Sequence, residues 1–88
     1  MSSISIRWDR RAVKELKRLS RNKRLTVLEG VESLRSNPHR GQVLCGQWKG
    51  LRRLRIGNVR VVYGFDGREL LISVLRVGHR REIYRRNS

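Results

Sequence analysis

The chain has 88 residues, enough for one domain but too few for separate cofactor and substrate domains. Its 22 Lys and Arg residues against 7 Asp and Glu residues give a net charge of +15, which favours nucleic acid, an anionic membrane surface or an acidic protein as partner. Cys45 is the single cysteine, which excludes an intramolecular disulfide, and the two histidines lack the Cys/His spacing of a zinc site.

Targeting signals are not evident in the sequence. No stretch approaches the roughly 20 apolar residues of a transmembrane helix. Residues 1–4 lack the charged and apolar regions of a signal peptide. We therefore expect a cytoplasmic protein that does not enter a membrane, with a single domain over residues 1–88.

The first half of the chain predicts a strand followed by two helices. Ile4, Ile6 and Trp8 alternate with polar residues, as in a strand. Asp9 suits a helix N-cap, and apolar residues follow it at helical spacing: Ala12, Val13, Leu16 and Leu19. Asn22 is the predicted cap of a second helix, which ends at Ser36-Asn37-Pro38 and has the apolar stripe Leu25, Leu28, Val31 and Leu34, with Val27 on its flank.

The second half predicts a loop and three strands. Residues 37–50 hold the one proline and three glycines, which is typical of a loop. Strands are expected at 51–56, 59–65 and 69–76, joined by tight turns at Gly57-Asn58 and Asp66-Gly67, with Val77-Gly78 ending the last. The order β-α-α-β-β-β predicts an α+β fold, in which a helical hairpin packs on a small, mainly antiparallel sheet. The apolar third strand of this meander is expected in a central or well-covered position.

The hairpin predicts a cluster of arginines. If Gly57 and Asn58 are the central turn residues, Arg55 pairs with Arg60, and Arg53 shares their face of the sheet. Like charges directly opposite each other destabilise a sheet. A local rule broken in this way commonly marks a functional site, so we interpret the cluster as a phosphate-binding surface.

The C-terminal tail adds basic and aromatic residues. Tyr84 stands among arginines, so it can stack on a base or, equally well, tether the tail to the sheet; the arginines are Arg80, Arg81, Arg85 and Arg86. His79 is a candidate for proton transfer, although a histidine at such a place is more often a plain surface residue. The carboxylates show no convergent pairing, so we expect neither a paired-carboxylate acid/base site nor a two-metal nuclease. We also expect no metal site and no cofactor.

Two segments resemble the RelE/ParE toxin superfamily. Residues 51–63, LRRLRIGNVRVVY, are similar to its signature hairpin, and residues 77–84, VGHRREIY, to its C-terminal motif. Length and element order agree as well. The resemblance covers essentially the whole chain and favours the RelE branch, whose members cleave mRNA in the ribosomal A site without a metal.

The resemblance also implies roles for individual residues. In the RelE branch a ribose 2′-hydroxyl attacks the adjacent phosphate and gives a 2′,3′-cyclic phosphate. Arg60 matches the arginine that contacts the scissile phosphate, Arg80 the arginine that stabilises the leaving group or transition state, and Tyr84 the tyrosine that orients the 2′-hydroxyl or acts as base. The expected RNA-binding residues are Arg53, Arg55, Arg81 and His79.

One departure from the family pattern concerns the base. Arg53 and Arg55 stand where the best-known members carry two lysines, and arginine does not give up its proton in proteins. These side chains can therefore bind phosphate but cannot serve as a general base. Tyr84 and His79 both remain candidates for that role.

The resemblance finally implies partners and alternatives. The expected partners are the ribosome with its A-site mRNA and a cognate acidic antitoxin that folds on binding, with operator DNA as a possible ligand of the toxin–antitoxin complex. The alternatives are a ParE-type toxin that inhibits DNA gyrase without nuclease activity, and a non-catalytic RNA- or DNA-binding module.

Overall fold

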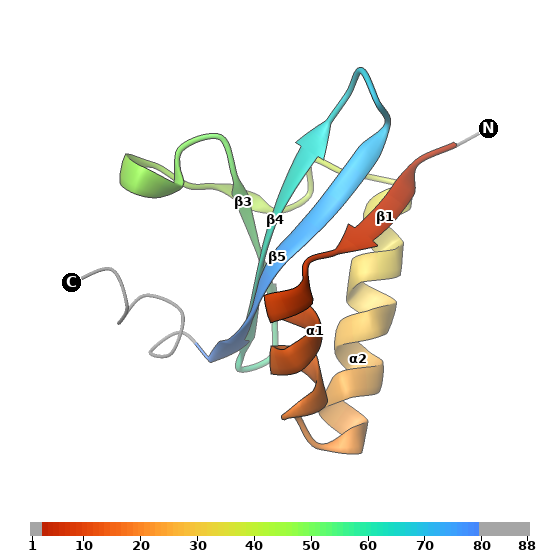
Figure 1. The fold of residues 1–88 in the computed structure, drawn as a ribbon, viewed down its shortest axis with the longest axis vertical. Coiled ribbons are helices and arrows are strands. Elements are labelled where there is room, and N and C mark those ends of the chain that lie inside the picture. Colours follow the sequence, from red (N-terminus) through yellow and green to blue (C-terminus); the bar gives the residue numbers. More distant parts are fainter. Residues whose placement is uncertain (1–2, 80–88) are drawn as a thin grey trace.

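Two helices cover one face of a five-stranded mixed sheet in the computed structural model, which describes residues 3–79 (Figure 1). The helices are α1 (Arg10–Lys17) and α2 (Arg21–Glu32), and they run in opposite directions. The strands are β1 (Ser5–Trp8), β2 (Gln42–Val43), β3 (Arg52–Ile56), β4 (Val59–Asp66) and β5 (Leu71–His79). Short 3-10 helices occupy Ser33–Arg35 and Gly46–Trp48. The predicted α+β fold is confirmed.

The sheet has the strand order β1-β5-β4-β3-β2. β1 runs parallel to β5, and the other neighbours are antiparallel. β5 therefore lies between β1 and β4, in the central position that its apolar sequence predicts. The pairing of β1 with β5 places Ile6 beside Ile72, so both side chains enter the same core.

The segment predicted as a loop at 37–50 contains an additional strand. In β2, Gln42 pairs with Arg53 and Val43 with Arg52, at the edge of the sheet. The order is thus β-α-α-β-β-β-β. A strand of two residues is too short to show an alternating pattern, which is why the sequence did not predict it.

The helix N-caps are partly as predicted. The Asp9 carboxylate accepts a hydrogen bond from the Arg11 N–H at 3.1 Å, which confirms the first cap. The second prediction is wrong, because Ser20 is the cap of α2 and its hydroxyl accepts from the Lys23 N–H at 3.4 Å. Asn22 lies in the first turn, where its carbonyl accepts from the Thr26 hydroxyl.

The buried side of α2 is rotated from the predicted stripe. Val27 and Val31 are buried, whereas Leu25 is 50% exposed. Gly30 lies on the inner side, where an added Cβ would come within 2.4 Å of Ile56 Cδ1. This close approach to β3 fixes which side of α2 faces the sheet.

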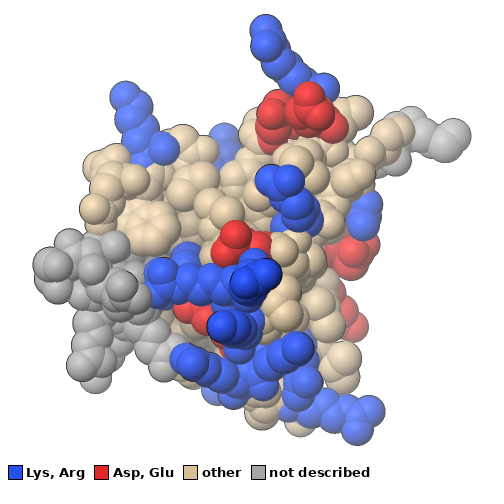
Figure 2. All heavy atoms as spheres, viewed as in Figure 1, with Lys and Arg blue, Asp and Glu red and all other residues tan. Residues whose placement is uncertain are grey.

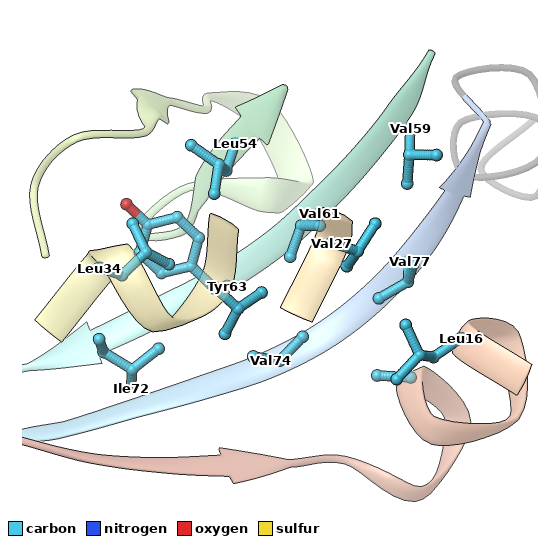
Figure 3. Close-up of a cluster of buried hydrophobic side chains, with 12 residues drawn as sticks. Leu16, Val27, Leu34, Leu54, Val59, Val61, Tyr63, Ile72, Val74 and Val77 are labelled. Atoms are coloured by element: carbon cyan, nitrogen blue, oxygen red, sulfur yellow. The ribbon is translucent and has the colours of Figure 1, made fainter. Parts of the chain in front are cut away.

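The core lies between the helices and the sheet (Figure 3). Its buried members come from both helices, the first 3-10 helix and three strands: Ala12, Leu16, Val27, Val31, Leu34, Leu54, Val59, Val61, Tyr63, Ile72, Val74 and Val77. Over residues 3–79, no helix combines the length and the hydrophobicity that crossing a bilayer requires.

The connection between β4 and β5 differs from the predicted tight turn. It spans residues 67–70, and the Asp66 carboxylate accepts from the Arg68 and Glu69 N–H groups at 2.9 and 3.2 Å. β5 therefore begins at Leu71 and continues through His79, past the Val77-Gly78 pair that was expected to end it. A register shift between Val62 and Tyr63 interrupts its pairing with β4.

Candidate nucleic-acid interface

The β3–β4 hairpin has the predicted register. Gly57 has φ 58° at the first central position, which fits a type II′ turn. Ile56 pairs with Val59, and Arg55 pairs with Arg60. The two arginines that the sequence placed opposite each other are indeed cross-strand neighbours.

The same register separates the two faces of the hairpin. Leu54 and Val61 are buried in the core under the helices. Their sequence neighbours Arg53, Arg55 and Arg60 consequently lie on the opposite face, here called the open face. Arg55 is exposed, while Arg53 and Arg60 are partly buried. The structure thus brings together the three predicted hairpin arginines.

The edge strand β2 helps to hold Arg53. The Arg53 guanidinium donates to Gln42 Oε1 on β2. The loop before β2 is itself fixed by Tyr63, whose hydroxyl donates to the Pro38 carbonyl at 2.8 Å and accepts from the Gly41 N–H at 2.9 Å. A buried tyrosine of the core therefore positions the strand that orients an arginine on the open face. Gln42 was not among the predicted site residues, because the two-residue strand that carries it was not predicted.

Tyr63 makes the stability of this region depend on pH. Burial raises the pKa of Tyr63 above 10.0, although the Gly41 N–H, Arg52 and Arg40 oppose the shift. A raised folded-state pKa contributes stability that is present below about pH 10 and is lost as pH rises through the folded-state value. We expect the free energy of unfolding to fall above pH 10 more steeply for the wild type than for Tyr63→Phe. Urea titrations between pH 8 and 11 measure the free energy of unfolding of both proteins. If that free energy fell equally steeply with pH in both, the assignment to Tyr63 would be wrong.

The open face continues onto β5 through another arginine. Val62, fully buried on this face, pairs with Arg76, and Arg60 pairs with Gly78. The Arg76 guanidinium is turned to Glu15 on α1, with Nη2 2.9 Å from Oε2. Both side chains are largely buried, at 8% and 15% exposure. Arg76 is therefore committed to a structural ion pair.

Glu15 also covers an open sheet edge. β1 pairs with β5 only as far as Val74, and α1 follows β1 at once. Glu15 Oε1 accepts from the Val77 N–H at 2.8 Å, so the helix satisfies a backbone group that a longer β1 would have paired. This contact secures the last part of β5. The sequence signal was an arginine in the apolar run around Val77 and an acid next to the buried Leu16.

The remaining predicted residues lie elsewhere or outside the described residues. His79 pairs with Val59, a core residue, so the register places it on the helix side of β5 and not on the open face. Arg80, Arg81 and Tyr84 fall outside residues 3–79. Within that range no three His, Cys, Asp or Glu side chains gather into a potential metal site.

Comparisons with known proteins identify the family. Residues 6–84 match the family model described as the ParE toxin of the type II toxin–antitoxin system parDE. A search of the curated proteins gave no match.

Solved toxin structures share the fold. The toxin–antitoxin complex RelBE2 of Mycobacterium tuberculosis gives a TM-score of 0.82 at 28% identity, covering 88% of this chain and 98% of the other. The isolated RelE toxin of E. coli gives 0.73 at 24% identity, with coverages of 97% and 95%. The chromosomal ParDE system of P. aeruginosa gives 0.66 at 19% identity, with coverages of 90% and 98%. Together with the family match over most of its length, this fold shows that the chain belongs to the ParE toxin family within the RelE/ParE superfamily and is the toxin of a toxin–antitoxin system.

Proposed function

We propose that this toxin is an mRNA endoribonuclease that acts on the ribosome. The observation that carries the proposal is the convergence of Arg53, Arg55 and Arg60 on the open face of the β3–β4 hairpin. Three guanidinium groups at neighbouring positions suit a phosphate whose negative charge increases during reaction. Arg55 and Arg60 repel each other across the strands, and a bound RNA phosphate would neutralise that repulsion.

The proposed reaction is an internal transfer within the RNA. The 2′-oxygen forms a bond to phosphorus, the bond from phosphorus to the 5′-oxygen breaks, and a 2′,3′-cyclic phosphate results. The 2′-hydroxyl proton passes to a general base, and the departing 5′-oxygen takes up a proton. Arg60 would neutralise charge on the phosphate, with Arg53 and Arg55 holding the flanking backbone. Because these groups mainly position and neutralise, we expect the ribosome to align the substrate.

The groups that move protons are assigned by resemblance. Arg80 would stabilise the leaving oxygen, Tyr84 would accept the 2′-proton, and Arg81 would bind RNA beside them. His79 is the other candidate base. Its register on the helix side of β5, away from Arg60, favours Tyr84.

The proposed regulator is an acidic antitoxin acting in the cytoplasm. The net charge of +15 favours an acidic chain as partner. The M. tuberculosis relative was solved as a toxin–antitoxin complex. We propose that the partner of this toxin covers the open face or displaces the tail, and that the complex is the form that meets operator DNA.

A second candidate function is inhibition of DNA gyrase without nuclease activity. The family description, ParE toxin of parDE, is the observation that favours it. This function would use the basic surface to bind a protein and would leave mRNA intact.

One experiment separates the two functions. Purified toxin is added to programmed ribosomes and to a gyrase supercoiling reaction, and mRNA 5′ ends are mapped by primer extension. We expect new 5′ ends within A-site codons on ribosomes, little cleavage of naked mRNA and normal supercoiling. Inhibited supercoiling with intact mRNA would establish the gyrase alternative and refute our proposal.

A matched pair of variants tests the arginine cluster in the same assay. Arg60→Gln should slow cleavage about a hundredfold, the usual effect of removing one group that stabilises a developing oxyanion. Arg68→Gln removes the same charge from the exposed β4–β5 connection and should cleave normally. Equal rates for the two variants would place the reaction away from the cluster.

A further inference from the structure

The helical hairpin carries a second basic surface, separate from the open face. Figure 2 shows Lys and Arg side chains gathered over α1 and the turn that leads to α2. Residues 10–24 contain eight basic residues and one carboxylate, Glu15. Seven of the basic residues are exposed and form what we call the hairpin surface: Arg10, Arg11, Lys14, Lys17, Arg18, Arg21 and Lys23.

This charge works against the stability of the helices. α1 has an acidic N-cap in Asp9 but no acidic residue in its first turn, and α2 has an acidic residue at neither place, although the macrodipole favours negative charge there. α1 begins instead with Arg10 and Arg11. Lys14 stands four residues after Arg10, an i,i+4 like-charge pair that destabilises a helix. Such a departure from helix rules indicates selection for something other than folding.

Glu15, the one carboxylate within residues 10–24, does not neutralise the hairpin surface. Glu15 Oε2 lies 2.9 Å from Arg76 Nη2 but 4.0 Å from Arg11 Nε. Its other oxygen accepts from the Val77 N–H. Glu15 is thus directed toward β5, so the positive field of the outer side of α1 reaches solvent.

The chemistry of the hairpin surface narrows the ligand. Residues 10–24 contain no aromatic side chain on which an unpaired base could stack. The exposed large apolar side chain beside the hairpin surface is Leu25 on α2, at 50% exposure, which falls short of the cluster of aromatic and aliphatic anchors at the centre of a protein–protein interface. What the hairpin surface offers is a set of cations at helical spacing, which suits rows of phosphates on a double helix.

We propose that the hairpin surface binds the backbone of double-helical RNA, independently of the strand held at the open face. The choice of RNA over DNA rests on the proposed function; the phosphate-binding role does not. Contacts of this kind are insensitive to base sequence, since RNA duplexes are recognised by shape and backbone. The toxin would hold structured RNA with α1 while the open face engages the strand to be cut.

The test measures binding of the full-length toxin to a fluorescent, blunt-ended RNA duplex of about 20 base pairs, long enough for a small domain. Lys14→Gln/Lys17→Gln removes two charges from the hairpin surface. Lys49→Gln/Arg68→Gln removes two exposed charges elsewhere, so both variants have the same net charge. Arg18→Gln/Lys23→Gln is a second variant of the hairpin surface. Circular dichroism checks that all remain folded.

We expect both variants of the hairpin surface to bind the duplex about tenfold more weakly than wild type. The control, Lys49→Gln/Arg68→Gln, should bind less than twofold more weakly. The slope of log affinity against log salt should fall in magnitude by about two for the hairpin variants. Equal weakening in all three variants would overturn the proposal, because only net charge would then matter. Tighter binding of a DNA duplex of the same length, or displacement of the RNA by a Glu-rich peptide at equal charge, would overturn it in favour of another ligand.

This assay contains no ribosomes, so its outcome is separate from that of the cleavage assay. A toxin that binds duplex RNA through the hairpin surface yet cleaves nothing on ribosomes would retain the second site and lose the proposed function. A toxin that cleaves mRNA, but whose duplex binding does not depend on the hairpin surface, would retain the proposed function and lose the second site.

Discussion

Tyr84→Phe should slow single-turnover cleavage on programmed ribosomes by a factor of about 10² to 10⁴, the range that a positioned general base contributes. The substitution removes one hydroxyl and keeps the ring, so stacking on a base would survive. Binding to ribosomes should therefore stay within about twofold of wild type, because the phosphate contacts of the arginines remain. The measurements are quench-flow cleavage at saturating toxin and sedimentation of toxin with ribosomes.

His79→Gln is the matched variant for this prediction. His79 is on the helix side of β5 by register, so we expect its loss to leave most of the cleavage rate. The opposite ranking, with His79→Gln inactive and Tyr84→Phe nearly normal, would move the base to histidine. Normal rates in both variants would leave catalysis to arginine electrostatics and ribosomal groups.

The part of the candidate site that could be predicted from the sequence is the β3–β4 hairpin. A two-residue Gly-Asn turn fixes which residues face each other, and alternation assigns each side chain to a face. Once the turn was recognised, Arg55 and Arg60 were necessarily cross-strand partners, and they are partners in the structure. Local chemistry determined this geometry, so one sequence was sufficient.

The helices were predictable in existence but not in detail. Both Ser20 and Asn22 are good N-caps, and propensity does not choose between them. Likewise, Leu25 and Val27 are both apolar, and only the contact of α2 with the sheet decides which is buried. Packing against distant elements settles such choices, and a single sequence does not display those elements.

The contacts that link α1 to β5 were not predictable. Glu15 and Arg76 are 61 residues apart, and their meeting depends on β1 ending where α1 begins. β2 escaped prediction for a related reason, since its two residues are a strand only because β3 lies beside them. The Glu15–Arg76 ion pair and β2 both support the candidate site, and both lie outside the β3–β4 hairpin.

Glu15→Gln should lower the free energy of unfolding by about 3–5 kcal/mol, the cost of leaving a buried charge without its partner. The amide oxygen can still accept from the Val77 N–H, so the loss reports mainly on Arg76. Glu32→Gln is the control, because its ion pair with Arg35 is exposed, at 63% and 41% for the two side chains. Such exposed pairs contribute about 0–1 kcal/mol.

The double variant Glu15→Gln/Arg76→Met decides whether the buried charge causes that loss. Removing both charges should recover most of the stability that Glu15→Gln alone loses, since a buried pair replaced by neutral groups often costs little. Urea unfolding of the wild type, Glu15→Gln, Arg76→Met, the double variant and the Glu32→Gln control measures this. A double variant as unstable as the sum of its single variants would show that Glu15 and Arg76 act independently. In that case the end of β5, from which the chain continues to Arg80 and Tyr84, would be held by the Val77 contact and core packing alone.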